Sequence, residues 1–185
     1  FEDILTLYTK ERHPWRWLQA SRRKAGVLRT LAMQNRNPIR MREVISIYRE
    51  QQTLLQLRYD PVSWAQLEHQ VAIALGTIGN ITEDPKKLRE AETAYLQAME
   101  ALPDKTSERM REINIDLARL RCDIGRMTSD KKTTQQAVAQ YEEVNKFNKE
   151  AGLGDDIESI NRAIKTCLGM PWVLSKADAE RLKKH

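Results

Sequence analysis

Hydrophobic residues recur along this chain three or four positions apart, the spacing of one helix face, and polar residues fill the positions between them. Between residues 61 and 79 the apolar set is Leu67, Val71, Ala74, Leu75 and Ile78. After residue 84 a second set follows, namely Leu88, Ala91, Ala94, Tyr95, Ala98 and Leu102. Such spacing predicts amphipathic α-helices. No run of alternating β-branched residues occurs, so the pattern predicts no strand.

The helical pattern is itself repeated without a gap, first at a shift of 47 residues and then at a shift of 46. The first shift places Trp17 on Trp64, Ala25 on Ala72, Asn37-Pro38 on Asp84-Pro85 and Tyr48 on Tyr95. The second shift places Gly79 on Gly125, Asp84 on Asp130, Ala91 on Ala137 and Tyr95 on Tyr141. Self-similarity at such a period is typical of helical repeat proteins, in which neighbouring units bury faces that one hairpin cannot cover.

Each copy is predicted to hold two helices that begin at recognisable residues. Proline is tolerated in the first helical turn, and the prolines that fit this position are Pro14, Pro38, Pro61 and Pro85. The side chains expected to cap helix starts are those of Asn37, Asp60, Asp84 and Asp130, with Thr106 or Ser107 in the third copy. Asp155-Asp156 is expected to cap a later helix beside Gly154. Gly79 and Gly125 are expected to let the chain leave the first helix of their copies.

These signals divide the chain into an all-α array of stacked antiparallel helical hairpins, residues 1–168. Its expected units are a partial repeat at 1–12, full repeats at 13–59, 60–105 and 106–154, and a partial repeat at 155–168. Residues 169–185, which include Trp172, are expected to form a C-terminal capping segment or a linker. Phe1 takes the register of Tyr48, so we expect the chain to open inside a second helix and to be part of a longer protein.

Ala91-x-x-x-Tyr95-x-x-Ala98, followed by Pro103, resembles the second helix of a tetratricopeptide repeat. The segments Tyr8-Thr9-Lys10-Glu11 and Pro61-Val62-Ser63-Trp64-Ala65 resemble a long bacterial variant of that family. The resemblance covers about residues 1–150, extends weakly to residue 168 and implies a right-handed solenoid. The period of 46–47 residues exceeds the usual family period of about 34, and repeats of the HEAT or armadillo type, whose period is in this range, remain an alternative.

The resemblance implies a protein–protein interaction scaffold, part of a larger multidomain bacterial protein, that binds a peptide or partner helix on the inner face of the solenoid. The inner face is the side of the first helices that meets the partner in this family. It maps onto Gln19, Arg22 and Arg29 in the first copy, Gln66, His69 and Ile73 in the second, and Glu112, Arg119 and Asp123 in the third. Gly26 and Cys122 fall on the same mapped positions. Arg22 and Arg29 could grip an acidic partner, and the alternative is that water solvates them.

Charge is distributed unevenly and leaves two other functions open. The net charge of the chain is +5. Residues 1–50 carry eleven Lys and Arg against five Asp and Glu, which gives +6, and residues 51–185 carry twenty against twenty-one, which gives −1. The basic first hairpin therefore suggests a nucleic-acid-binding solenoid as one alternative. Self-association through open solenoid ends, which would give a homo-oligomer, is the other.

No pattern of catalytic or metal-binding residues occurs in the sequence, so we expect no enzyme activity, no cofactor and no metal. The three histidines, His13, His69 and His185, lie far apart in the sequence. Cys122 and Cys167 form neither a C-x-x-C motif nor a disulfide framework, so we expect buried thiols in a reducing compartment. No apolar segment is long enough to cross a membrane, and we expect a cytoplasmic location. Trp17 and Trp64 are repeated and are expected to pack in the core or between hairpins.

Overall fold

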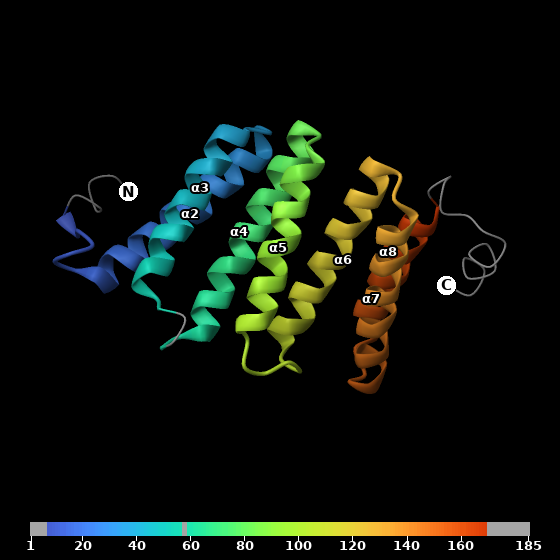
Figure 1. The fold of residues 1–185 in the computed structure, drawn as a ribbon. Helices are drawn as coiled ribbons and strands as arrows, with labels where there is room; N and C mark the ends of the chain where they lie inside the picture. Colours follow the sequence, from blue (N-terminus) through green and yellow to red (C-terminus); the bar gives the residue numbers. More distant parts are fainter. Residues whose placement is uncertain (1–6, 57–58, 170–185) are drawn as a thin grey trace. The chain divides into compact units, whose positions relative to one another are not determined.

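The computed structural model describes residues 7–56 and 59–169, and this part of the chain is all-helical (Figure 1). Over these residues it contains seven helices and no strand, which confirms the all-α part of the predicted fold class. The helices are α2 (Pro14–Gln34), α3 (Pro38–Leu54), α4 (Pro61–Thr82), α5 (Pro85–Ala101), α6 (Glu108–Thr128), α7 (Lys131–Glu150) and α8 (Gly154–Leu168). None of these helices combines the length and apolar character that a membrane crossing requires.

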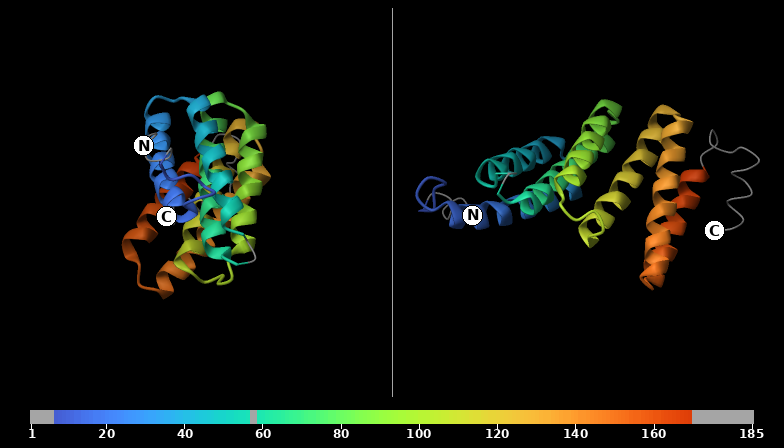
Figure 2. Two further views of the ribbon diagram at one scale, coloured as in Figure 1. Left: turned by 90° about the vertical axis from the view of Figure 1, so that its left-hand side faces the viewer. Right: turned by 60° about the horizontal axis from the view of Figure 1, so that its bottom comes forward.

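The chain divides into two compact units, residues 1–105 and 106–185. In the first unit α2 packs on α3, α3 on α4 and α4 on α5, so the helices follow one another in chain order (Figure 2). In the second unit α6 packs on α7 and α7 on α8. The predictions about Phe1 and about a cap or linker containing Trp172 fall outside the described residues.

Five helix starts have the side-chain caps that the sequence predicts. In α3 the carboxamide of Asn37 accepts hydrogen bonds from the backbone N–H groups of Ile39 and Arg40, at 3.0 and 3.1 Å. The other caps are Asp60 for α4, Asp84 for α5, Ser107 for α6 and Asp130 for α7. The bond from the Ser63 N–H group also lowers the pKa of the Asp60 carboxyl group, because it stabilises the charged form. Each cap satisfies an N–H group that the helix itself leaves free, so helix starts were predictable locally.

The start of α8 differs from the prediction that Asp155-Asp156 caps it. Leu153 occupies the cap position, and no side chain there accepts a hydrogen bond. The helix begins one residue before the two aspartates, which therefore belong to its first turn. The carboxylate of Asp156 instead accepts a hydrogen bond from Nη1 of Arg111 in α6, at 2.5 Å.

Gly79 and Gly125 do not end their helices, contrary to the prediction, because α4 continues to Thr82 and α6 to Thr128. The residues in the left-handed conformation that end these helices are Glu83 and Ser129, with φ of 53° and 54°. The glycines instead permit a close approach of the next helix. A Cβ on Gly79 would lie 2.5 Å from Cδ2 and 3.0 Å from the backbone nitrogen of Leu88, at the start of α5.

We expect Gly79→Ala to lower the free energy of unfolding by about 1–3 kcal/mol, because the added methyl group overpacks the contact with Leu88. Gly26→Ala is the matched control, since it lies inside α2 with open space where its Cβ would be. That substitution should raise the free energy of unfolding by up to about 1 kcal/mol, the helix-propensity gain of alanine. Urea denaturation followed by circular dichroism measures both, and a change of the same sign in both variants would contradict this role of Gly79.

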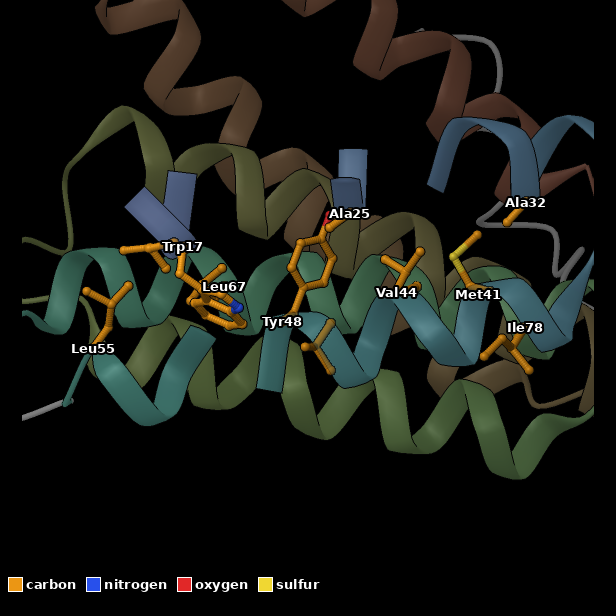
Figure 3. Packing of buried hydrophobic residues seen from close by; sticks show 12 residues of the cluster. Trp17, Ala25, Ala32, Met41, Val44, Tyr48, Leu55, Leu67 and Ile78 are labelled. Carbon is orange, nitrogen blue, oxygen red and sulfur yellow. The ribbon is translucent and has the colours of Figure 1, made fainter. Parts of the chain in front are cut away.

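The core of the first unit lies where α3 packs between α2 and α4 (Figure 3). Tyr48 of α3 is 4% exposed and stands among residues of all three helices, including Trp17, Ala25 and Leu67. Tyr95 in the second copy and Tyr141 in the third are buried as well. Burial raises the pKa of the Tyr141 hydroxyl group to about 12, since the charged form would lose its hydration. The predicted apolar sets therefore face the core, with the repeated tyrosines filling space between helices.

The core of the second unit contains a disulfide bond that the sequence analysis did not predict. Cys122 of α6 and Cys167 of α8 are joined, with their Cα atoms 5.8 Å apart, a usual separation for a disulfide. Both residues are buried among Tyr141, Ile160 and Ile164. The expectation of two separate thiols is therefore wrong, because the fold brings together two residues that are 45 positions apart in the sequence. Cys122 is therefore not an available inner-face residue, since its sulfur is bonded to that of Cys167.

Candidate functional site

The mapped inner-face residues of the first unit lie on α2 and α4 and differ in how much surface they offer. Gln19 and Arg22 of α2 are exposed, and Arg29 is half-buried. On α4, Gln66 and Ile73 are half-buried. His69 is only 6% exposed, and its ring centroid lies 5.5 Å from that of Tyr95 in α5. His69 therefore packs between α4 and α5 and presents little surface to a partner.

Two exposed apolar side chains lie on the same side of α2 as the mapped residues. Trp15 is 70% exposed and Met33 is 50% exposed. Steps of three or four residues connect them to the mapped positions, which places them all on one helix face. We call this face the α2 stripe, and it consists of Trp15, Gln19, Arg22, Gly26, Arg29 and Met33. Trp15 and Met33 were not among the predicted binding residues, although the same spacing extended by one turn at either end reaches both.

The two arginines of the α2 stripe have different surroundings. Nη1 of Arg29 donates a hydrogen bond to Oε1 of Gln70, which connects α2 to α4. Nε of Arg29 is buried and has no hydrogen-bond partner in the described part of the chain. Arg22 is exposed. Burial raises the pKa of the nearby Tyr48 hydroxyl group, and the positive charges of Arg29 and Arg22 oppose that rise. Arg22 is therefore the arginine best placed to meet a partner, while Arg29 fixes the surface beneath it.

The mapped residues of the second unit lie on α6 and carry charges of both signs. Glu112 and Arg119 are exposed, and Asp123 is half-buried. The guanidinium group of Arg119 pairs with the carboxylate of Asp116 at 3.0 Å, and that of Arg126 pairs with Asp123 at 2.8 Å. The two residues of each pair are one helical turn apart, and exposed pairs of this kind contribute little to stability. The α6 surface is thus polar and nearly neutral, in contrast to the basic α2 stripe.

Over residues 7–56 and 59–169, no three His, Cys, Asp or Glu side chains come close enough together to hold a metal ion. The imidazole of His69 lies against the ring of Tyr95, with the ring centroids 5.5 Å apart. What the α2 stripe can do chemically is bind, through an aromatic ring, a thioether and a guanidinium group that face water.

Comparisons with family models, with curated proteins and with solved structures find no match for this chain. Its likeness to tetratricopeptide repeats therefore stays a prediction from the residues quoted above.

Proposed function

We propose that this chain is a protein–protein interaction scaffold, a right-handed solenoid of stacked hairpins similar to tetratricopeptide repeats, which binds a partner along the α2 stripe. The observation that carries the proposal is the exposure of Trp15 on the same helix face as Arg22. Tryptophan and arginine are the side chains that most often dominate the binding energy of protein interfaces. Aromatic residues and arginine are also enriched at protein interfaces relative to the rest of the protein surface.

The chemistry of the stripe favours a partner peptide or helix that is acidic and has at least one apolar side chain. Arg22 can bind a carboxylate with two parallel hydrogen bonds, and Trp15 and Met33 offer apolar surface at either end of the helix face. Half-buried Gln66 and Ile73 of α4 extend the surface beyond α2. The half-buried positions of α4 can contribute shape complementarity, while His69 contributes only to the packing beneath them.

The distribution of basic residues supports a protein partner over a nucleic acid. Arg22 and Arg29 belong to the α2 stripe, whereas Arg16 and Arg23, also seven residues apart, occupy a different side of the same helix. Lys24 already pairs with Glu43 of α3 at 3.7 Å. A phosphate backbone requires many cations along one surface, and the first hairpin spreads its cations over several. The experiment below distinguishes a protein partner from nucleic-acid binding and from self-association.

The test is retention of a specific protein from a nuclease-treated lysate of the source cells by the immobilised 185-residue chain. We expect Arg22→Glu and Trp15→Ala each to reduce retention at least about tenfold, the effect of losing a residue that dominates an interface. Arg23→Glu is the matched control, because it makes the same charge change at an exposed neighbouring position on another side of α2.

Three results would contradict the proposal. Equal retention by the wild type, Arg22→Glu and Trp15→Ala would show that the partner uses another surface. Binding that appears only when nuclease is omitted, and weakens steeply with salt, would identify a nucleic-acid surface instead. If the immobilised chain retains only further copies of itself, and the oligomer size of the free chain increases with its concentration, self-association is favoured.

A further inference from the structure

A groove in the first unit lies where the ends of α3 and α5 flank the start of α4. It has a volume of about 800 Å³ and is lined by Arg49, Pro61, Trp64, Gln97, Glu100 and Ala101. We call it the Trp64 groove. Trp64 is half-buried, so the sequence prediction that it packs as Trp17 does is only partly right. The Trp64 groove shares no residue with the α2 stripe, so it stands independently of the proposed function.

In the first copy of the repeat, a lysine of the chain itself lies over Trp17, the residue equivalent to Trp64. The ammonium group of Lys10 lies 5.8 Å from the centroid of the Trp17 ring. It donates a hydrogen bond to Oγ1 of Thr53 at 2.8 Å and lies 3.8 Å from the carboxylate of Glu50. One lysine thus joins a tryptophan face, a hydroxyl group and a carboxylate, a combination in which cation–π attraction adds to an ion pair.

A shift of 47 residues relates the three partners of Lys10, namely Trp17, Glu50 and Thr53, to residues that line the Trp64 groove. It places Trp17 on Trp64, Glu50 on Gln97 and Thr53 on Glu100, and all three equivalents line the groove. The tryptophan, one carboxylate and one neutral polar group are therefore present in both copies, with the carboxylate moved by one helical turn. The position equivalent to Lys10 is Leu57, which carries no charge. The second copy thus has the partners of a lysine without an equivalent lysine in the sequence.

Electrostatics in the groove also favour a cation. Glu100 lies in the last turn of α5, whose carbonyl groups form the negative end of the helix dipole, and that turn holds no basic residue. Lys105, beyond the helix, donates to the backbone carbonyls of Met99 and Glu100 at 2.6 and 3.0 Å. The Glu100 carboxylate itself has no hydrogen bond or ion pair with any residue that the structure describes.

The arginine in the groove does not supply the missing positive charge. Nη1 and Nη2 of Arg49 both donate to the carboxylate of Glu68, the second at 3.0 Å. Glu68 is fully buried, so its charge balances that of Arg49 at short range. With this pair neutral, Glu100 gives the described lining residues of the groove a net charge of −1.

We propose that the Trp64 groove binds the side chain of a lysine from a partner polypeptide. The ammonium group lies over the Trp64 ring and pairs with the Glu100 carboxylate, and its methylene groups contact Pro61 and Ala101. The amide oxygen of Gln97 accepts a further hydrogen bond from the ammonium group. This is the arrangement of Lys10 in the first copy, with the lysine supplied by a second molecule.

The probe for this site is the peptide acetyl-Gly-Lys-Gly-amide, titrated into the 185-residue chain. The readout is the NMR signal of the Trp64 indole N–H group, assigned with the Trp64→Phe variant. We expect a saturating shift with a dissociation constant on the order of 1–10 mM, as befits one side chain. The signal of exposed Trp15 serves as an internal control and should not move. Added salt should weaken the binding, because the ion pair is solvent-accessible.

A second peptide and two variants decide the outcome. Acetylating the lysine of the probe removes its charge and should abolish the shift. Glu100→Gln should weaken binding at least about fivefold, the effect of losing one charge-assisted bond. Glu90→Gln, the same change ten residues earlier in α5, should leave binding unchanged. A Trp64 signal that stays fixed with about 50 mM peptide, an equal response to the acetylated peptide, or equal binding by the Glu100→Gln variant would overturn the proposal.

Discussion

Loss of the Cys122–Cys167 disulfide is expected to lower the free energy of unfolding of the second unit by about 4 kcal/mol. The bond closes a loop of 45 residues, and the chain-entropy model gives about this stabilisation for such a loop, since the crosslink limits the unfolded chain. The effect is a large fraction of the total stability of an ordinary domain. We expect α8 to exchange its amide hydrogens much faster when the bond is reduced, because the crosslink that ties it to α6 is then lost.

Hydrogen exchange of the full chain, with and without a reductant, measures this effect helix by helix. The matched variant is Cys122→Ala/Cys167→Ala, which should behave as the reduced wild type and should not respond to the reductant. Amide groups of α4 in the first unit provide a reference that should change little. Equal protection of α8 in the oxidised and reduced wild-type chain would contradict a stabilising role for the bond.

The disulfide also bears on the compartment in which the protein works. Disulfides persist in oxidising compartments and are rare where thiol reductants are abundant. The sequence suggested a reducing compartment because its cysteines lacked a motif, and the pairing of Cys122 with Cys167 removes that reason. A cytoplasmic location stays a prediction, and the redox state of the pair in cells would test it.

The features that were predictable from the sequence are those determined within one or two helical turns. Asn37, Asp60 and Asp130 cap their helices through N–H groups two or three residues away, so local spacing is enough to find them. The apolar sets were predictable because helix periodicity places them on one face. The burial of the tyrosines was predictable from the repeat, since equivalent positions in a repeat are expected to meet equivalent neighbours.

The features that were missed depend on which residue of a neighbouring helix a side chain contacts. Gly79 was assigned to a helix end, but its role is set by Leu88 of the next helix. His69 was mapped onto the binding face from the register of Arg22, yet α5 covers it through Tyr95. The partnership of Cys122 and Cys167 required the packing of α6, α7 and α8 together. A single sequence does not specify these tertiary neighbours, so the candidate site was predicted less completely than the fold.

The second large effect is expected at the ion pair between α3 and α4, where Arg49→Met should lower the free energy of unfolding by about 3 kcal/mol. Glu68 is fully buried and accepts hydrogen bonds from Arg49 and from Nε2 of Gln52, the latter at 2.7 Å. Removal of the arginine leaves a buried carboxylate with only an amide donor, and breaking such a pair costs about 3–5 kcal/mol. We expect the lower end because the arginine side chain is 45% exposed and water can enter its place.

Arg89→Met is the matched control for this prediction, because the Arg89 side chain is 46% exposed and also pairs with a carboxylate, that of Glu92, which lies one turn away in the same helix and keeps 15% exposure. It should cost less than about 1 kcal/mol, because pairs one helical turn apart are weak and Glu92, unlike Glu68, keeps contact with water. The double variant Arg49→Met/Glu68→Met should recover most of the loss of Arg49→Met, since replacing both charges by apolar groups leaves no buried charge unpaired. Urea denaturation of the three variants measures all of these differences. If Arg49→Met and Arg89→Met cost the same, or the double variant is less stable than Arg49→Met, burial of Glu68 does not determine the strength of this contact.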